Sequence, residues 1–227
     1  MLGLRAAGRP ARELEDARAY LARTEDGLRT ATDVETALLA AAALGQPSPS
    51  LVRRLRELER PSGLIGSTLN ATIWGVLALR AAREEVRPAT VRTLLRAQRP
   101  SGGWGWTAAA AADSNDTAAA IMALRAVRVA GLPIARGLSF LARHRSRDGG
   151  FELARGRGSD AQSTAWAVQA YVAAGRRPPP GSLAYLRRLQ RPDGSIRYSA
   201  RYAATPVWVT SQALPALAGK PLPLRPG

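Results

Sequence analysis

The sequence predicts an all-α protein built from repeated helical hairpins. A seven-residue unit with the skeleton Q-x-x-x-G-x-W occurs in full at 98–104 and in degenerate form four more times. Its glycines, at positions 27, 63, 102, 149 and 194, are separated by 36, 39, 47 and 45 residues. A recurring spacing in this range is typical of repeat architectures. No segment shows the alternation of apolar and polar residues expected of a half-buried β-strand.

Each repeat contains two helical patterns of different character. The first is small and apolar and covers 36–44, 72–82, 117–129, 164–174 and 207–218. The second has one apolar face and many arginines and covers 11–22, 50–59, 89–98, 134–144 and 182–190. A helix that is apolar on all sides is buried, whereas one with a charged face lies at the surface. We therefore expect ten helices in five hairpins, with the first kind inside and the second kind outside.

Residues that terminate and begin helices separate these segments. Proline- and glycine-containing stretches at 46–49, 131–133 and 178–180 break the chain between inner and outer helices. Asp, Asn, Ser or Thr precedes the inner helices and is a good N-cap. The turn glycines are predicted to need open or positive φ angles. Gly102→Val and Gly149→Val should therefore each destabilise the fold by about 1 kcal/mol or more.

Composition excludes several kinds of site. The 227-residue chain is 46% hydrophobic, which supports one domain over 1–227, and it has no cysteine and one histidine, His144. Thiolate and His-rich metal sites are therefore excluded, and we expect neither a metal nor a cofactor. No apolar run reaches the roughly 18 residues of a membrane span, and no signal peptide is visible. We expect a cytoplasmic protein as the chain is written, or a secreted one if the true start lies upstream.

The chain carries a formal net charge of +16, and Lys220 is its single lysine. Such a charge attracts nucleic acid and anionic lipid. The arginines, such as Arg53, Arg92 and Arg187, are scattered over the predicted outer faces rather than gathered in one block. This pattern favours a solvated surface over a nucleic-acid footprint. Peripheral contact with an anionic membrane surface stays open as an alternative.

The Q-x-x-x-G-x-W series resembles the prenyltransferase and squalene oxidase repeats of squalene–hopene cyclases. This resemblance implies an α/α toroid whose inner helices line a cavity for an apolar, isoprenoid or lipid-like ligand. Toroids of this class usually have six hairpins, so the five found here predict an incomplete ring. The Gln and the aromatic residue of the unit have a structural role, because the amide can bond the backbone of the next helix.

The motif Asp113-Ser-Asn115-Asp116-Thr-Ala resembles the D-x-D-D-T-A of the same cyclases. In that family the middle Asp protonates a terminal alkene, and its place is taken here by Asn115, whose amide cannot deliver such a proton. The resemblance therefore implies ligand binding without alkene-protonating activity. Asp113 and Asp116 are the candidate catalytic residues of a divergent active cyclase. Helix capping is the favoured alternative, because Asp160 stands four residues before a threonine just as Asp113 does.

Tryptophans are the candidate ligand-binding residues, together with Asn115. Trp74, Trp166 and Trp208 each follow by two residues the aligned positions 72, 164 and 206, so we expect them at similar heights on inner helices. They line the cavity or fill the wall between the helix layers. Trp104 and Trp106 precede the 113–118 motif and are expected at the cavity rim.

A second resemblance concerns the segment 162–170, Gln-Ser-Thr-Ala-Trp-Ala-Val-Gln-Ala. It is similar to the S-T-x-x-A-x-Q-A-L segment of cobalamin carriers of the intrinsic-factor type, which have a related α/α barrel. This similarity implies an alternative in which the protein binds a corrinoid without chemistry. The basic outer surface suggests a further alternative, in which the protein is a scaffold.

Overall fold

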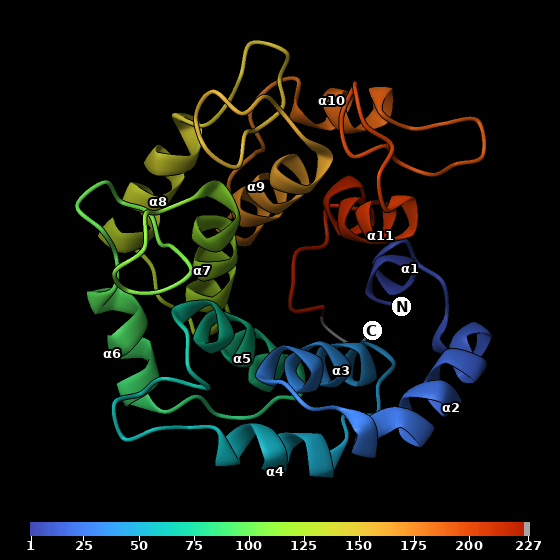
Figure 1. The fold of residues 1–227 in the computed structure, drawn as a ribbon, viewed down its shortest axis with the longest axis vertical. Coiled ribbons are helices and arrows are strands. Elements are labelled where there is room, and N and C mark those ends of the chain that lie inside the picture. Colours follow the sequence, from blue (N-terminus) through green and yellow to red (C-terminus); the bar gives the residue numbers. More distant parts are fainter. Residues whose placement is uncertain (225–227) are drawn as a thin grey trace.

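Helices form all the regular secondary structure of residues 1–224, which are the residues that the computed structural model describes. They make two concentric layers around a central axis (Figure 1). The inner layer comprises α1 (Leu2–Ala6), α3 (Ala31–Ala43), α5 (Leu69–Ala81), α7 (Ser114–Ala126), α9 (Ala161–Ala173) and α11 (Pro206–Leu217). The outer layer comprises α2 (Glu15–Thr24), α4 (Pro49–Glu57), α6 (Pro88–Arg96), α8 (Leu132–Ala142) and α10 (Ser182–Arg188). Two 3₁₀ turns, η1 (Ala11–Leu14) and η2 (Glu25–Gly27), flank α2.

The inner layer is a closed ring, which differs from the incomplete ring predicted from five hairpins. Helix α1 lies between α11 and α3 and contacts both (Figure 1). Its approach to α11 is close, because a Cβ added to Gly3 would lie 2.7 Å from the carbonyl oxygen of Ser211. Helix α1 was not predicted, because five residues are too few to show a helical period.

Burial follows the predicted division into inner and outer helices. The segment from Ala118 to Leu124 in the middle of α7 is at most 2% exposed. The outer helix α4 instead buries Leu51 and Leu55, one turn apart, and leaves its three arginines half-buried or exposed. None of the helices within residues 1–224 combines the length and the apolarity needed to cross a membrane.

The inner helices begin three to five residues earlier than predicted at four positions, because each begins directly after its capping residue. The side chains of Thr30, Thr68, Asp113 and Asp160 each accept a hydrogen bond from the backbone N–H three residues later. This confirms the predicted N-caps. Helix α11 begins at Pro206 without a side-chain cap, and proline at the first position needs no N–H partner.

The repeat unit makes a tight turn between each outer helix and the next inner helix. Gly63, Gly102, Gly149 and Gly194 have φ between 82° and 92°, as predicted, whereas Gly27 does not have a positive φ. Gln98 donates from Nε2 to the carbonyl oxygens of Gly102 (2.8 Å) and Pro133 (2.9 Å). The amide thereby ties the end of α6 to the start of α8, which confirms its structural role.

Candidate functional site

A cavity of about 540 Å³ lies inside the ring, at the N-terminal ends of the inner helices. We call it the apolar cavity. Its wall includes four tryptophans and aliphatic residues such as Leu39 and Leu153. Polar side chains from the starts of α5 and α7 line another part of this wall: Asn70, Asp113, Asn115 and Asp116. A concave, mostly apolar space with a few convergent polar groups is the usual form of a small-molecule site.

Trp74 of α5 and Trp166 of α9 form the centre of the aromatic wall. Their ring centroids are 5.1 Å apart and their planes meet at 75°, an edge-to-face arrangement. Helix α7 separates α5 and α9 in the ring, so the contact joins two non-adjacent helices across the cavity. Edge-to-face pairs stabilise one another and leave ring faces free for an apolar or cationic partner.

Trp208 also lines the cavity, but the prediction that it shares the height of Trp74 and Trp166 is wrong. In three of the repeats the N–H groups of Ile65, Phe151 and Ile196 donate to the hydroxyls of Thr72, Thr164 and Thr210. Thr210, rather than position 206, is therefore the equivalent threonine, and Trp208 precedes it. Trp208 consequently lies one turn nearer the start of its helix and is 57% exposed, against 6% for Trp166.

The two tryptophans before the 113–118 motif have different positions. Trp106 lines the cavity and is 55% exposed. Trp104 does not rim the cavity: its side chain is fully buried and its Nε1 donates to the carbonyl oxygen of Leu94 on α6 at 2.7 Å. Trp104 is the aromatic residue of the repeat unit, and it packs between the inner and outer layers, where a ligand cannot reach it.

Asp113 is the N-cap of α7. Its Oδ1 accepts from the backbone N–H of Asp116 at 2.8 Å, and Asp160 accepts from that of Ser163 at 2.7 Å in the next repeat. Both carboxylates lie at the positive end of a helix, where they compensate the exposed amides. The capping interpretation is therefore confirmed for Asp113 and for Asp160.

Asp116 has a different role, because its side chain caps nothing and faces the apolar cavity. It is 5% exposed, and its Oδ1 accepts from Nδ2 of Asn70 at 2.6 Å. Burial, together with the neighbouring charge of Asp113, raises the pKa of Asp116 to about 7, although the bond from Asn70 opposes this shift. The site thus holds a carboxyl group that carries a proton for much of the time near neutral pH. Sequence reasoning missed Asn70, which is 46 residues away and belongs to no motif.

Comparison with known proteins agrees with this architecture. No protein-family model matches the sequence. The chain is 39% identical over 129 residues to a drimenyl diphosphate synthase from Streptomyces showdoensis, a match that covers 51% of this chain and 23% of that protein. Solved structures of the type II terpene cyclase MstE from Scytonema superpose over 96% of this chain and 84% of theirs. The complex with the product merosterolic acid A gives a TM-score of 0.71 at 17% identity. A protein from Actinoplanes gives 0.61 at 19% identity, over 83% of this chain and 75% of that one.

This chain has the type II terpene cyclase fold. The resemblance inferred from the Q-x-x-x-G-x-W units is therefore confirmed at the level of the fold. The matched stretch is less than a quarter of the curated relative's length, so that relative's activity does not carry over with the similarity.

Within this fold, Asn115 lies in the apolar cavity beside Asp116. Its Oδ1 is buried and has no hydrogen-bond partner within residues 1–224. An unpartnered buried amide oxygen costs free energy unless a ligand or water supplies a donor. Asn115 therefore places an amide, and no acidic proton, in the wall of the apolar cavity.

Gln169, the glutamine of the segment similar to cobalamin carriers, has a structural contact. Its Oε1 accepts from the backbone N–H of Leu222 at 3.3 Å. This bond holds the C-terminal segment across the ring, where it lies between the inner helices (Figure 1). Leu222 closes the apolar cavity on the side facing the C-terminal ends of the inner helices.

Proposed function

We propose that this protein binds an isoprenoid chain in the apolar cavity. The observation that carries the proposal is the pair of Trp74 and Trp166 inside the ring, with Trp106 and Trp208 at the same cavity. Flat aromatic faces match an unsaturated hydrocarbon chain and stabilise positive charge that develops on it. The volume of about 540 Å³ is within the usual range for a ligand of this size class.

The similarity to type II terpene cyclases supports the same ligand class. One MstE structure contains geranylgeranyl dihydroxybenzoate, described as its substrate, and superposes with a TM-score of 0.69. Both that substrate and the product merosterolic acid A of the other complex occupy a protein with this fold. An isoprenoid is therefore the first ligand class to test.

The first test measures binding of geranylgeraniol by quenching of tryptophan fluorescence. Trp74→Ala removes one indole from the cavity and should weaken binding about tenfold, since a buried aromatic contact contributes on the order of 1–2 kcal/mol. Tyr20→Ala is the matched control, because Tyr20 is 59% exposed and lies outside the cavity. Equal affinity for both variants would exclude the apolar cavity as the binding site.

A second candidate function is isoprenoid cyclisation with Asp116 as the acid. The observation that favours it is the buried, proton-holding carboxyl in the cavity wall. In such a step the O–H bond of Asp116 would break as a C–H bond forms at a terminal alkene, leaving a carbocation on the more substituted carbon. Loss of a proton from a later cation would end the reaction.

Binding without this chemistry remains the preferred function for a physical reason. The pKa of Asp116 is raised, so its carboxyl is a weaker acid than an ordinary aspartic acid, whereas alkene protonation needs a strong one. Gas chromatography of geranylgeraniol incubated with wild type and with Asp116→Asn separates the two functions. Cyclised product from wild type that disappears in Asp116→Asn would establish the second.

A further inference from the structure

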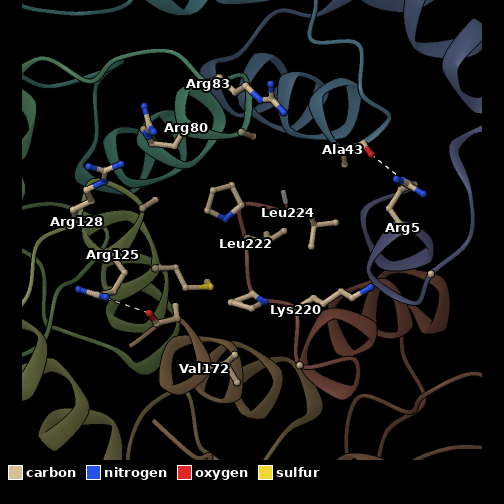
Figure 2. Close-up of a pocket in the computed structure, with 18 residues that line it drawn as sticks. Arg5, Ala43, Arg80, Arg83, Arg125, Arg128, Val172, Lys220, Leu222 and Leu224 are labelled. Atoms are coloured by element: carbon tan, nitrogen blue, oxygen red, sulfur yellow. Dashed lines mark hydrogen bonds between the residues drawn. The ribbon is translucent and has the colours of Figure 1, made fainter. Parts of the chain in front are cut away.

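A second cavity, of about 1080 Å³, lies at the opposite end of the ring, where the inner helices end. We call it the basic cavity. Among residues 1–224, its lining contains no acidic residue and six cationic ones: Arg5, Arg80, Arg83, Arg125, Arg128 and Lys220. Figure 2 shows these side chains distributed around the opening, with Leu222 and Leu224 of the C-terminal segment across its middle. The apolar and basic cavities meet at Leu222, which lines both.

Three of the arginines have a structural explanation. Arg5, Arg80 and Arg125 each lie one residue before the end of an inner helix, and each donates to the carbonyl oxygen four residues later. Arg5 and Arg125 also donate to Ala43 and Ala173, at the ends of α3 and α9. Cations at these positions compensate the negative ends of the helices.

Arg83 and Arg128 do not have this explanation. Each of the six inner helices is followed, two residues after its end, by a residue with positive φ. At four helices that residue is glycine: Gly8, Gly45, Gly175 and Gly219. At α5 and α7 it is Arg83 and Arg128, both with φ of 65°. A residue with a side chain costs free energy in this left-handed conformation, and glycine avoids that cost. The adjacent helices α5 and α7 are therefore each followed by an arginine at a position where the backbone conformation favours glycine.

The side chains of Arg83, Arg128 and Lys220 are exposed, and within residues 1–224 they make no hydrogen bond or ion pair. Six helix C-termini together contribute about three negative charges to this end of the ring. The six cations exceed that sum. The basic cavity therefore keeps a net positive potential after the helix ends are compensated.

We propose that the basic cavity binds a phosphate-bearing anion, with Arg83 and Arg128 as its principal ligands. A guanidinium group binds two oxygens of a phosphate at once. Two arginines that follow neighbouring helices can bind two phosphate groups, which favours a ligand such as a diphosphate. The same chemistry is offered by a free diphosphate and by the headgroup of an anionic lipid. This site is separate from the apolar cavity and does not depend on the function proposed for that cavity.

The test uses the double variant Arg83→Gly/Arg128→Gly. It removes both ligands and gives α5 and α7 the residue that follows the other four inner helices, so the melting temperature should stay equal or rise. Binding of inorganic diphosphate, measured by isothermal titration calorimetry, should weaken about tenfold or more. The matched control is Arg53→Ala/Arg92→Ala, which removes the same charge from exposed positions of α4 and α6 and should keep wild-type affinity.

A parallel measurement distinguishes the two sources of the anion. Co-sedimentation with phosphatidylcholine vesicles, with and without phosphatidic acid, identifies a lipid headgroup if wild type binds the acidic vesicles and the glycine variant does not. Saturable binding of diphosphate without vesicle binding identifies a free ligand. The proposal is overturned if wild type binds neither, if the glycine variant binds as wild type does, or if the control loses as much affinity as the glycine variant.

Discussion

The apolar cavity and the basic cavity lie at opposite ends of one ring and are built from the same six inner helices. At the first end the helices begin, and the charged side chains are the acids Asp113 and Asp116. At the second end the helices finish, and the charged side chains are five arginines and a lysine. Helix dipoles alone predict this distribution of charge, because acids stabilise helix N-termini and bases stabilise C-termini.

The charged side chains at the two ends are of two kinds: those that cap a helix and those that do not. Asp113 caps α7, and Arg80 and Arg125 bond the carbonyls that follow their own helices. Asp116 at one end, and Arg83 and Arg128 at the other, have no such capping contact. Residues of this second kind are the ones for which we propose a role in the two cavities, since no capping contact accounts for their side chains.

The largest expected effect concerns left-handed residues at the two ends. Gly102 has a φ of 92°, and a Cβ there would lie 2.5 Å from the carbonyl oxygen of Arg136. Gly102→Val should lower the free energy of unfolding by roughly 2–4 kcal/mol, from left-handed strain plus steric overlap. Arg83→Gly should raise it by about 0.5–1 kcal/mol. Chemical denaturation measures both. If both variants changed the free energy of unfolding in the same direction, the backbone would have the same requirement for glycine at the two positions, and the comparison would be wrong.

The next effect is a loss of stability with rising pH, caused by buried acids on the inner helices. Glu35 of α3 is 1% exposed, neither of its carboxylate oxygens has a partner within residues 1–224, and burial raises its pKa to about 8. The pKa of Asp116 is raised to about 7. Both folded-state values exceed the unfolded ones, so the folded state holds these protons more tightly. The resulting stability is complete below about pH 4 and is lost as pH rises through 8.

Urea denaturation between pH 5 and pH 9 measures this decline. It should be on the order of 7 kcal/mol, because the two raised pKa values lie together about five units above pH 5 and each unit corresponds to about 1.4 kcal/mol. Glu35→Gln should remove most of the pH dependence of the free energy of unfolding. This holds whether the substitution raises or lowers that free energy at any single pH. An unchanged pH profile in Glu35→Gln would show that Glu35 does not hold its proton in the folded state.

The sequence was sufficient to predict the helical layers, the N-caps, the turn glycines and the bond from Gln98, because each depends on residues within one repeat. Ring closure by α1 was missed because that helix is only five residues long. The position of Trp208 along its helix was predicted wrongly because Pro206 was aligned with Thr72 and Thr164. The residue equivalent to those threonines is Thr210.

The basic cavity was also missed, although the sequence contained a signal for it. Arg80 and Arg83 are spaced as Arg125 and Arg128 are, and the two pairs occupy the same place in successive repeats. Treated as isolated surface charges, they suggested only a solvated face. Closure of the ring brings them together with residues from both ends of the chain, Arg5 and Lys220, and no local pattern predicts that meeting.

The smallest expected effect is the absence of a reaction. Wild type should not cyclise squalene, because Asn115 stands where the related cyclases have an acidic proton. Asn115→Asp should also remain inactive, since aromatic residues are 5% of the chain and a cyclising cavity must shield a series of carbocations from water. Incubation in detergent followed by gas chromatography checks both. Pentacyclic product above the no-enzyme control would show that the apolar cavity can protonate an alkene and shield the resulting carbocations from water.

The most direct test of the division between the two ends is a crossed binding measurement. Native mass spectrometry would follow geranylgeraniol and inorganic diphosphate on wild type, on Trp74→Ala and on Arg83→Gly/Arg128→Gly. We expect Trp74→Ala to lose geranylgeraniol and keep diphosphate, and the glycine variant to lose diphosphate and keep geranylgeraniol. If either variant lost both ligands while remaining folded, or if geranylgeraniol binding depended on the arginines and not on Trp74, the assignment of separate roles to the two cavities would be contradicted.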